Sequence, residues 1–295
     1  DVAARALNSD APNTIVAAAA LSELAIRYAG RDPEEAEEAA KKCLRITLNE
    51  QAHLGYRFKA LHALCKICQS AERWAEGELF ARQALELIPD LPMAMGTEAR
   101  ESIMLSYACF AAVSNRVPEF RKTLETLEAR LPVEDTTTRS SMKLALGQAM
   151  ARRGDWEGGY LLMKEAASTK GCYIDTWYHT IPIARLVGDK EGYHSLCVYA
   201  LTRFGAGAND NHAMMLVDGL ADPWSGFLSH PILEELVNEA ELGISVNPRG
   251  YVLLSRAVLE YKKGRYEEAE PLIDEFIADK MLPPVDGYFL QAMVK

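Results

Sequence analysis

Three side chains that can bind metal ions recur on one stretch of the chain: His62, Cys65 and Cys68. Their spacing of three residues would place them near one stripe of a helix. A zinc site usually takes four ligands, commonly as two such pairs with a loop between them, and no second Cys or His pair follows. Free cysteine also packs as a small apolar side chain. We therefore predict that Cys65 and Cys68 are core residues and that the chain binds no metal or other cofactor.

The sequence lacks the motifs that mark common catalytic sites. It contains no Walker-type glycine-rich loop, no HExxH, no GxSxG and no kinase HRD or DFG triplet. Acidic pairs such as Glu34 with Glu35 and Glu267 with Glu268 fall in the first turns of expected helices, where the helix dipole favours negative charge. The sequence thus predicts a protein that is not an enzyme.

Composition excludes several classes of partner. The 295 residues are 49% apolar and 25% charged, which is ordinary for a soluble globular protein. The net charge of −10 means that a nucleic-acid backbone would bind against the overall field of the chain. No apolar run is long enough to span a membrane, and the first residues lack the features of a signal peptide. We expect no nucleic-acid partner and no membrane span.

The six cysteines are scattered along expected helices, which is typical of a reducing compartment, so we predict a cytoplasmic protein. The chain does not begin with Met and ends within an apparent helix, so we expect it to be a piece of a longer polypeptide.

The elements that must position any site are best seen in residues 146–167, LGQAMARRGDWEGGYLLMKEAA. This stretch predicts two short amphipathic helices joined by a Gly-Asp turn. Gly147 lies between two large side chains on one helical face, so a neighbouring helix can approach closely there. Gly154 ends the first helix where a left-handed residue costs least, and Asp155 can cap the second. A hairpin this small cannot bury its own apolar face and must stack on copies of itself.

Similar hairpins recur along the whole chain, and almost no alternating strand pattern is present. From Gly154 to the next matching glycine, Gly188, is 34 residues. We therefore predict an all-α solenoid that spans residues 1–295 as a single domain. Its seven hairpins are expected at about 14–48, 54–89, 99–132, 140–168, 173–204, 211–246 and 250–280, followed by a capping or truncated helix at 284–295.

Some side chains have an expected environment. The polar stretch VEDTTTRSS, residues 133–141, is expected to be an exposed loop. Trp74, Trp156 and Trp177 occupy repeat-defining positions and are expected in the core. Trp224, in the irregular turn DPWSGF, is either an exposed anchor for a partner or tucked under its own loop.

The array resembles the tetratricopeptide repeat (TPR) family, whose unit has about 34 residues. The resemblance implies a right-handed α-α superhelix that binds a protein or peptide in its concave groove and catalyses nothing. Gly77 and Gly159 stand where the family has alanine. The residues that match the family pattern directly are Leu146, Gly147, Gly154, Asp155 and Trp156, then Trp177, Gly188 and Asp189, then Gly264, Arg265, Tyr266 and Ala269.

The resemblance also implies which side chains line the groove, because the family uses fixed positions on the first helix of each repeat. Such basic, polar and aromatic side chains would suit an extended peptide that carries carboxylates. A solvated face without a ligand is the alternative, and only Asp175 among the equivalent places is acidic. Carried over one by one, the positions are Lys59, His62, Lys66, Gln69, Asn115, Arg116, Gln148, Arg152, Tyr178, Arg185, Tyr261 and Lys262.

Three other interpretations stay open. Residues 177–205 and 250–273 also resemble the repeat regions that follow the catalytic domain in some large bacterial serine/threonine kinases, which implies an intramolecular regulatory module of a signalling kinase. An apolar face of helix 284–295, with Tyr288, Phe289 and Ala292, would suit a homo-oligomerisation scaffold that forms a homodimer through its end helices. The stripe of His62, Cys65 and Cys68 would suit a metal-binding protein or an enzyme.

Overall fold

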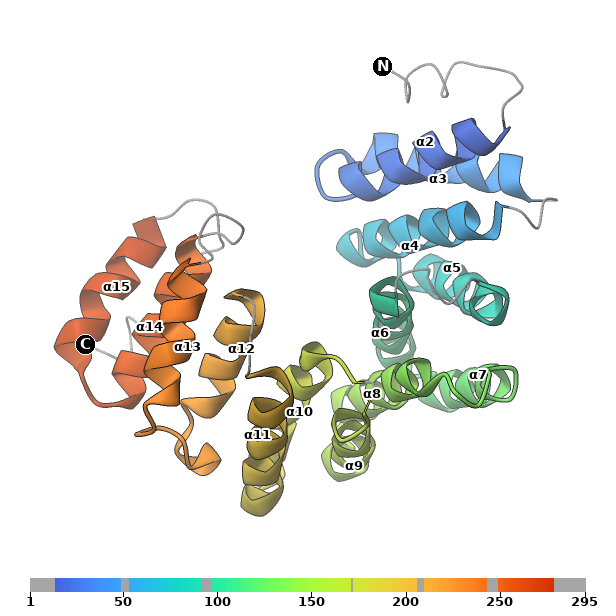
Figure 1. Cartoon of the computed structure of the whole chain (residues 1–295). Coiled ribbons are helices and arrows are strands. Elements are labelled where there is room, and N and C mark those ends of the chain that lie inside the picture. The colour runs from blue at the N-terminus through green and yellow to red at the C-terminus, as the bar shows by residue number, and fades with distance from the viewer. Residues whose placement is uncertain are drawn as a thin grey trace. The chain divides into compact units, whose positions relative to one another are not determined.

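The computed structural model describes residues 14–48, 53–91, 97–170, 172–205, 210–242 and 249–278. Within these ranges the chain folds into 14 α-helices with short 3-10 turns and no strands, so the predicted all-α fold is confirmed (Figure 1). The helices pair as the seven predicted hairpins. The expected helix at 284–295, with Tyr288, Phe289 and Ala292, lies outside the described residues.

The chain divides into two compact units, Asp1–Cys172 and Tyr173–Lys295. Each unit is an array of stacked hairpins, and the prediction of one continuous solenoid over residues 1–295 stays a prediction.

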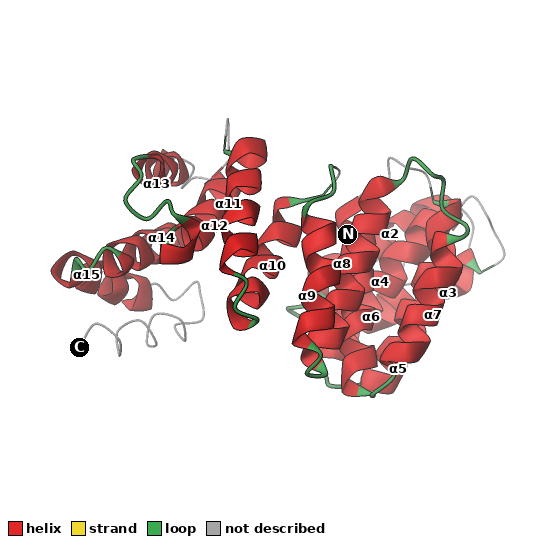
Figure 2. Ribbon diagram, turned by 90° about the horizontal axis from the view of Figure 1, so that it is seen from below, coloured by secondary structure: helices red, strands yellow, loops and turns green. Residues whose placement is uncertain are grey.

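Unit 1 contains four hairpins, in each of which a first helix precedes a second helix. Every first helix after α2 packs on the first helix and on the second helix of the hairpin before it, which is the stacking expected of TPR-like hairpins. Figure 2 shows α2, α4, α6 and α8 together in one layer with α3, α5 and α7 beside it. The pairs are α2 (Thr14–Tyr28) with α3 (Pro33–Thr47), α4 (Leu54–Ser70) with α5 (Trp74–Leu87), α6 (Thr97–Val113) with α7 (Val117–Glu128), and α8 (Thr136–Arg152) with α9 (Trp156–Ala167).

Unit 2 repeats this contact pattern with three hairpins, since α12 packs on α10 and α11, and α14 packs on α12 and α13. Its irregular link between α12 and α13 contains a 3-10 turn, η3 (Pro223–Ser225), that packs against α11. The helices are α10 (Ile174–Leu186), α11 (Lys190–Phe204), α12 (Asp210–Leu220), α13 (Ile232–Leu242), α14 (Arg249–Lys262) and α15 (Tyr266–Ala278).

In five of the seven hairpins, the turn places a left-handed residue two positions before the second helix. Gly154, Gly188 and Gly264 have φ angles of 90°, 77° and 75° there. At the same position of earlier hairpins stand Glu72, with φ 55°, and Asn115, with φ 58°. The predicted role of Gly154 is therefore confirmed, and the same geometry is imposed on side chains that pay for it with strain.

The residue after this turn either caps the second helix or ties it to the hairpin before. The carboxylate of Asp155 accepts a hydrogen bond from Gly158 N at 3.0 Å, which confirms the predicted cap. Where arginine replaces aspartate, its guanidinium contacts a glutamate on the preceding second helix. These pairs are Arg73 with Glu37 at 2.6 Å, Arg116 with Glu78 at 3.2 Å and Arg265 with Glu234 at 3.3 Å.

The core of unit 1 is continuous from α4 to α8 and contains the predicted cysteines, since Cys65 and Cys68 have no exposed surface. Trp177 in unit 2 is equally buried, as predicted. Trp74 is half-buried against Phe110 of the next hairpin. Trp156 is 44% exposed, so its prediction as a core residue is wrong. It belongs to the last hairpin of unit 1, where no following first helix within the unit covers it.

The predicted exposed loop at 133–141 is wrong for most of its length, because α8 begins at Thr136. Asp135 caps this helix through Thr138 N, and its buried carboxylate pairs with Arg100 at 3.4 Å. Ser140 Oγ donates to the Ala166 carbonyl at 2.9 Å, and Ser141 Oγ donates to a carboxylate oxygen of Glu101 at 2.8 Å. Polar side chains that can hydrogen-bond across helices are thus compatible with burial.

The predicted close approach at Gly147 is confirmed. A Cβ atom on Gly147 would lie 2.6 Å from the Gly159 carbonyl oxygen, and one on Gly159 would lie 2.5 Å from the Gly147 carbonyl oxygen. Gly77 likewise leaves room for Phe110, whose Cζ would lie 2.4 Å from an added Cβ. At Gly77 and Gly159 neighbouring atoms therefore leave no room for a Cβ atom.

The contact between α8 and α9 gives the first testable prediction. Gly147→Ala should lower the free energy of unfolding by about 1–3 kcal/mol, because overpacking at the Gly159 carbonyl outweighs the helix propensity of alanine. Thermal unfolding followed by circular dichroism measures this. Gly30→Ala is the control, since nothing lies within 4 Å of a Cβ there. Equal melting temperatures for the two variants would contradict the close approach.

The left-handed turns give a second prediction. Gly154→Ala should destabilise the protein by about 1–2 kcal/mol, because the space around it is open and only its φ angle disfavours a side chain. Glu72→Gly should shift stability in the opposite direction, since it removes the same strain. Chemical denaturation of both variants measures the sign of each change in the free energy of unfolding. Changes of the same sign would show that the left-handed conformation at this turn position does not determine stability.

Candidate functional site

The predicted groove residues divide between the two units. Unit 1 contains the predicted residues Lys59, His62, Lys66, Gln69, Asn115, Arg116, Gln148 and Arg152. Tyr178, Arg185, Tyr261 and Lys262 belong to unit 2. The two sets are therefore described as two separate surfaces.

Two of the four first helices of unit 1, α4 and α8, carry basic side chains and no acidic ones. Each contains three Lys or Arg residues. The second helices α3, α5 and α7 carry four, three and three glutamates. A chain that is acidic overall thus presents cationic side chains from α4 and α8.

Helix register aligns the exposed side chains of these first helices. In each hairpin, positions can be counted back from the first residue of its second helix. The residues eight positions before it are Lys66, Cys109 and Gln148, and Val113 and Arg152 lie four positions before it. All five are exposed or partly exposed. With Lys59 and Leu105, which are also partly exposed, they make up what we call the first-helix face of unit 1: Lys59, Lys66, Leu105, Cys109, Val113, Gln148 and Arg152.

His62 lies beneath this face rather than on it. Its Nε2 atom is hydrogen-bonded to Ser102 Oγ at 2.8 Å, which joins α4 to α6, and the residue is buried. Burial, with the nearby charge of Lys66, lowers the pKa of His62 to about 4. The imidazole is therefore neutral at physiological pH and contributes to packing between hairpins.

Cys65 and His62 face different helices. Cys65 Sγ contacts the Gly77 carbonyl oxygen at 3.8 Å, on the side of α5, whereas His62 points to α6. Burial raises the pKa of Cys65 above its usual value and that of Cys68 to about 11, so both thiols stay protonated. Over the described ranges no three His, Cys, Asp or Glu side chains gather as metal ligands would.

Two predicted groove residues are not on a first helix. Helix α6 ends at Val113, so Asn115 and Arg116 lie in the turn that follows it. Asn115 is the left-handed turn residue, a conformation that asparagine tolerates better than most side chains. Arg116 points back to Glu78, a buried glutamate of α5. Their placement on the first helix is therefore wrong, because the turn occupies both positions.

In unit 2 the charge of Arg185 is matched inside the protein. Its Nη1 atom lies 2.8 Å from Asp222 Oδ1, and its guanidinium lies 4.4 Å from the centre of the Trp224 ring. Trp224 is half-buried and also meets the edge of Tyr193. Of the two expectations for Trp224, the structure favours packing within its own surroundings. At the other end of the unit, Tyr261 is partly buried against Tyr266, and Lys262 is exposed.

Asp218 joins three consecutive first helices of unit 2. Tyr178 Oη on α10 donates to Asp218 Oδ2 at 3.3 Å, and Ser255 Oγ on α14 donates to Asp218 Oδ1 at 3.2 Å. Burial raises the pKa of Asp218 to about 6, although both hydrogen bonds oppose the shift. The sequence analysis missed this residue because the sixth hairpin did not align with the family positions.

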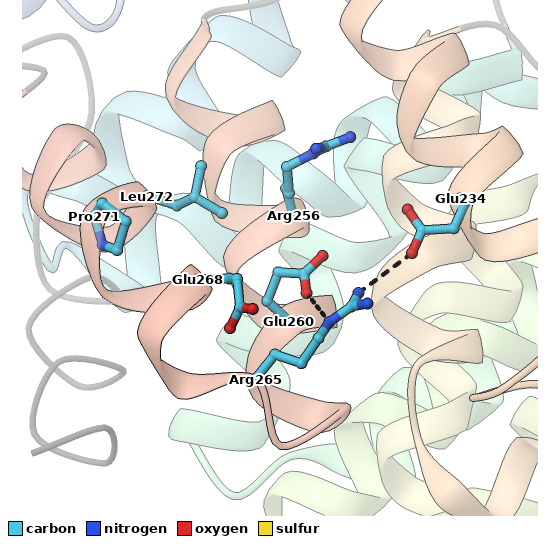
Figure 3. Close-up of a pocket in the computed structure, with 7 residues that line it drawn as sticks. All are labelled: Glu234, Arg256, Glu260, Arg265, Glu268, Pro271 and Leu272. Atoms are coloured by element: carbon cyan, nitrogen blue, oxygen red, sulfur yellow. Dashed lines mark hydrogen bonds and ion pairs between the residues drawn. The ribbon is translucent and has the colours of Figure 1, made fainter.

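A pocket of about 470 Å³ lies among α13, α14 and α15 (Figure 3). Arg265 crosses it, with Nη2 at 3.3 Å from Glu234 Oε1 and an ion pair to Glu260. Arg256 belongs to the same lining and contacts Glu241 at 2.8 Å. Glu268, Pro271 and Leu272 of α15 complete it. The pocket was not predicted, because the reasoning on sites considered only first-helix positions.

The chain matches no protein-family model and no curated protein sequence. Among solved structures it is similar to one titled "Crystal structure of APC/C hetero-tetramer Cut9-Hcn1", with 11% sequence identity and a TM-score of 0.45. The match covers 95% of this chain and 52% of the other, so the chain spans about half the length of that protein.

None of the described helices combines the length and the apolar character needed to cross a membrane.

The buried carboxyl of Asp218 gives a third prediction, on pH. Because its pKa is higher in the folded than in the unfolded chain, its contribution to stability is fully present at low pH and is lost as the pH rises through about 6. Asp218→Asn should therefore raise the melting temperature relative to the wild type more at about pH 7.5 than at about pH 4.5.

Differential scanning calorimetry at the two pH values measures this, with Glu239→Gln, an exposed carboxylate on α13, as the control. If the melting temperatures of Asp218→Asn and the wild type differ by the same amount at both pH values, a raised pKa at Asp218 is ruled out.

Proposed function

We propose that the protein is a non-catalytic scaffold that binds a carboxylate-bearing segment of a partner protein on the first-helix face of unit 1. The observation that carries this proposal is the purely basic charge of two first helices of unit 1. Helices α4 and α8 lack acidic residues, whereas the second helices beside them carry glutamates. In a chain of net charge −10, such a face is the favoured place for a negatively charged partner.

The cations on this face are available to a partner. Lys66 and Arg152 are exposed and have no ion-pair partner among the described residues. Lys59 is 3.9 Å from Glu23, and both of these side chains are partly solvated, so this pair is weak. Charge-assisted hydrogen bonds to a carboxylate are stronger than neutral ones, and these three residues can supply them.

Apolar side chains lie between the cations. Leu105 and Cys109 on α6 are partly exposed, and Val113 at the end of the same helix is 51% exposed. The proposed ligand therefore combines acidic with apolar residues, the first for orientation and the second for buried area.

The face is held in place before a partner arrives. His62 ties α4 to α6 through Ser102, and Glu101 ties α6 to α8 through Ser141. A surface made of packed helices loses little conformational freedom on binding, so more of the contact energy contributes to affinity.

The two alternatives stay predictions. A regulatory module of a bacterial signalling kinase would use the same face for a segment of its own polypeptide. A homo-oligomerisation scaffold would depend on helix 284–295, which lies outside the described residues.

The test is a pull-down from source lysate with the wild type and with a Lys66→Glu, Arg152→Glu double variant. We expect the double variant to capture at least about tenfold less partner than the wild type, since two cations of the face become anions. Because both side chains are exposed, circular dichroism should show equal helicity.

The matched control is Lys122→Glu, Lys170→Glu, which changes the net charge equally at exposed sites outside the face. Equal loss in both double variants would reduce the effect to overall charge, and equal capture by all three proteins would place the binding surface elsewhere.

A further inference from the structure

The charged residues of α13 and α15, which are the second helices of the last two hairpins, are all acidic. Helix α13 carries four glutamates and α15 carries five Asp or Glu residues, and neither contains Lys or Arg. Only part of this charge is matched, since Glu234 pairs with Lys263 and Arg265, and Glu241 pairs with Arg256. The glutamates of these helices that are exposed are Glu235, Glu239, Glu267, Glu268, Glu270 and Glu275.

The pocket described above opens between these helices. Its two arginines are already matched by glutamates, as Figure 3 shows for Arg265, which lies between Glu234 and Glu260. Glu268 lines the pocket without an ion-pair partner among the described residues. Three carboxylates against two guanidinium groups leave the lining with an excess of negative charge.

One wall of the pocket is apolar. Pro271 and Leu272 of α15 stand beside Glu268 (Figure 3). Lysine and arginine side chains bury an aliphatic stem along apolar surface and keep a charged head for a carboxylate. A wall of this kind next to an unmatched carboxylate therefore fits a long cationic side chain.

We propose that the face of α13 and α15 is a docking surface for a lysine- or arginine-bearing segment of a partner protein, one cationic side chain of which enters the pocket. The stem of that side chain packs on Leu272 and Pro271, and its head binds Glu268. The exposed glutamates of α13 and α15 attract the remaining basic residues of the segment.

Other ligands fit the pocket less well. A phosphate or nucleic acid would meet excess negative charge, and a purely apolar group would meet five charged side chains. This proposal goes beyond the acidic partner proposed for unit 1, because it concerns a partner of opposite charge on a different unit. The two can therefore fail independently.

The test uses the intact chain and a fluorescein-labelled synthetic peptide of Lys, Arg, Leu and Ser residues. Fluorescence anisotropy measures its affinity, and a carbodiimide then joins lysine amines to the carboxylates they contact, with loss of water. Mass spectrometry should locate the amide cross-links chiefly at Glu268 and its neighbours on α13 and α15. A Glu235→Gln, Glu268→Gln variant should bind the peptide roughly fivefold more weakly.

The matched control is Glu119→Gln, Glu125→Gln, which removes two exposed glutamates from α7 in unit 1. Equal weakening in both variants, or cross-links spread over α3, α5 and α7, would overturn the proposal in favour of unspecific attraction. Analytical ultracentrifugation of the wild type alone tests whether a second copy of this chain binds to the surface. A dimer lost in both the Glu268→Lys and the Lys66→Glu variants would replace the proposed partner with another copy of this chain.

Discussion

Each hairpin of this chain leaves apolar surface that only the first helix of the next hairpin can cover, and the rest of the structure depends on that constraint. In unit 1 the core is therefore continuous from α4 to α8. The contact requires close approach, which explains why Gly77 of α5 leaves room for Phe110 of α6, and Gly147 and Gly159 make a similar close approach within one hairpin. It also explains the exposure of Trp156 in the hairpin that ends the unit.

The same constraint decides which surfaces remain for partners. Stacking covers the sides of each hairpin, so the first helices keep one free face and the second helices keep another. Arginines such as Arg73, hydrogen-bonded to Glu37, link one hairpin to the next and hold the pKa of that carboxyl at about 2. Cations on α4 and α8 make the free first-helix face of unit 1 basic, and carboxylates on α13 and α15 make these second helices of unit 2 acidic.

Sequence patterns predicted what depends on local chemistry. Gly154 and Asp155 could be assigned because a left-handed turn and a helix cap favour particular residue types. The stretch at 133–141 could not, since Asp135 and Ser141 are buried only because of hydrogen-bonding partners on other helices. The ion pair of Arg185 with Asp222 could not be predicted either, because Asp222 lies between α12 and α13, in the hairpin that fits the repeat pattern poorly.

The most direct test of the account uses Cys109, the one cysteine of the six that is not buried, which lies on the first-helix face of unit 1. The rate of its alkylation by a maleimide is measured with and without the partner captured by the wild-type chain. The account predicts that the bound partner slows alkylation at least about tenfold, because it covers the surface between Lys66 and Arg152. An unchanged rate in the saturated complex would contradict binding at this face.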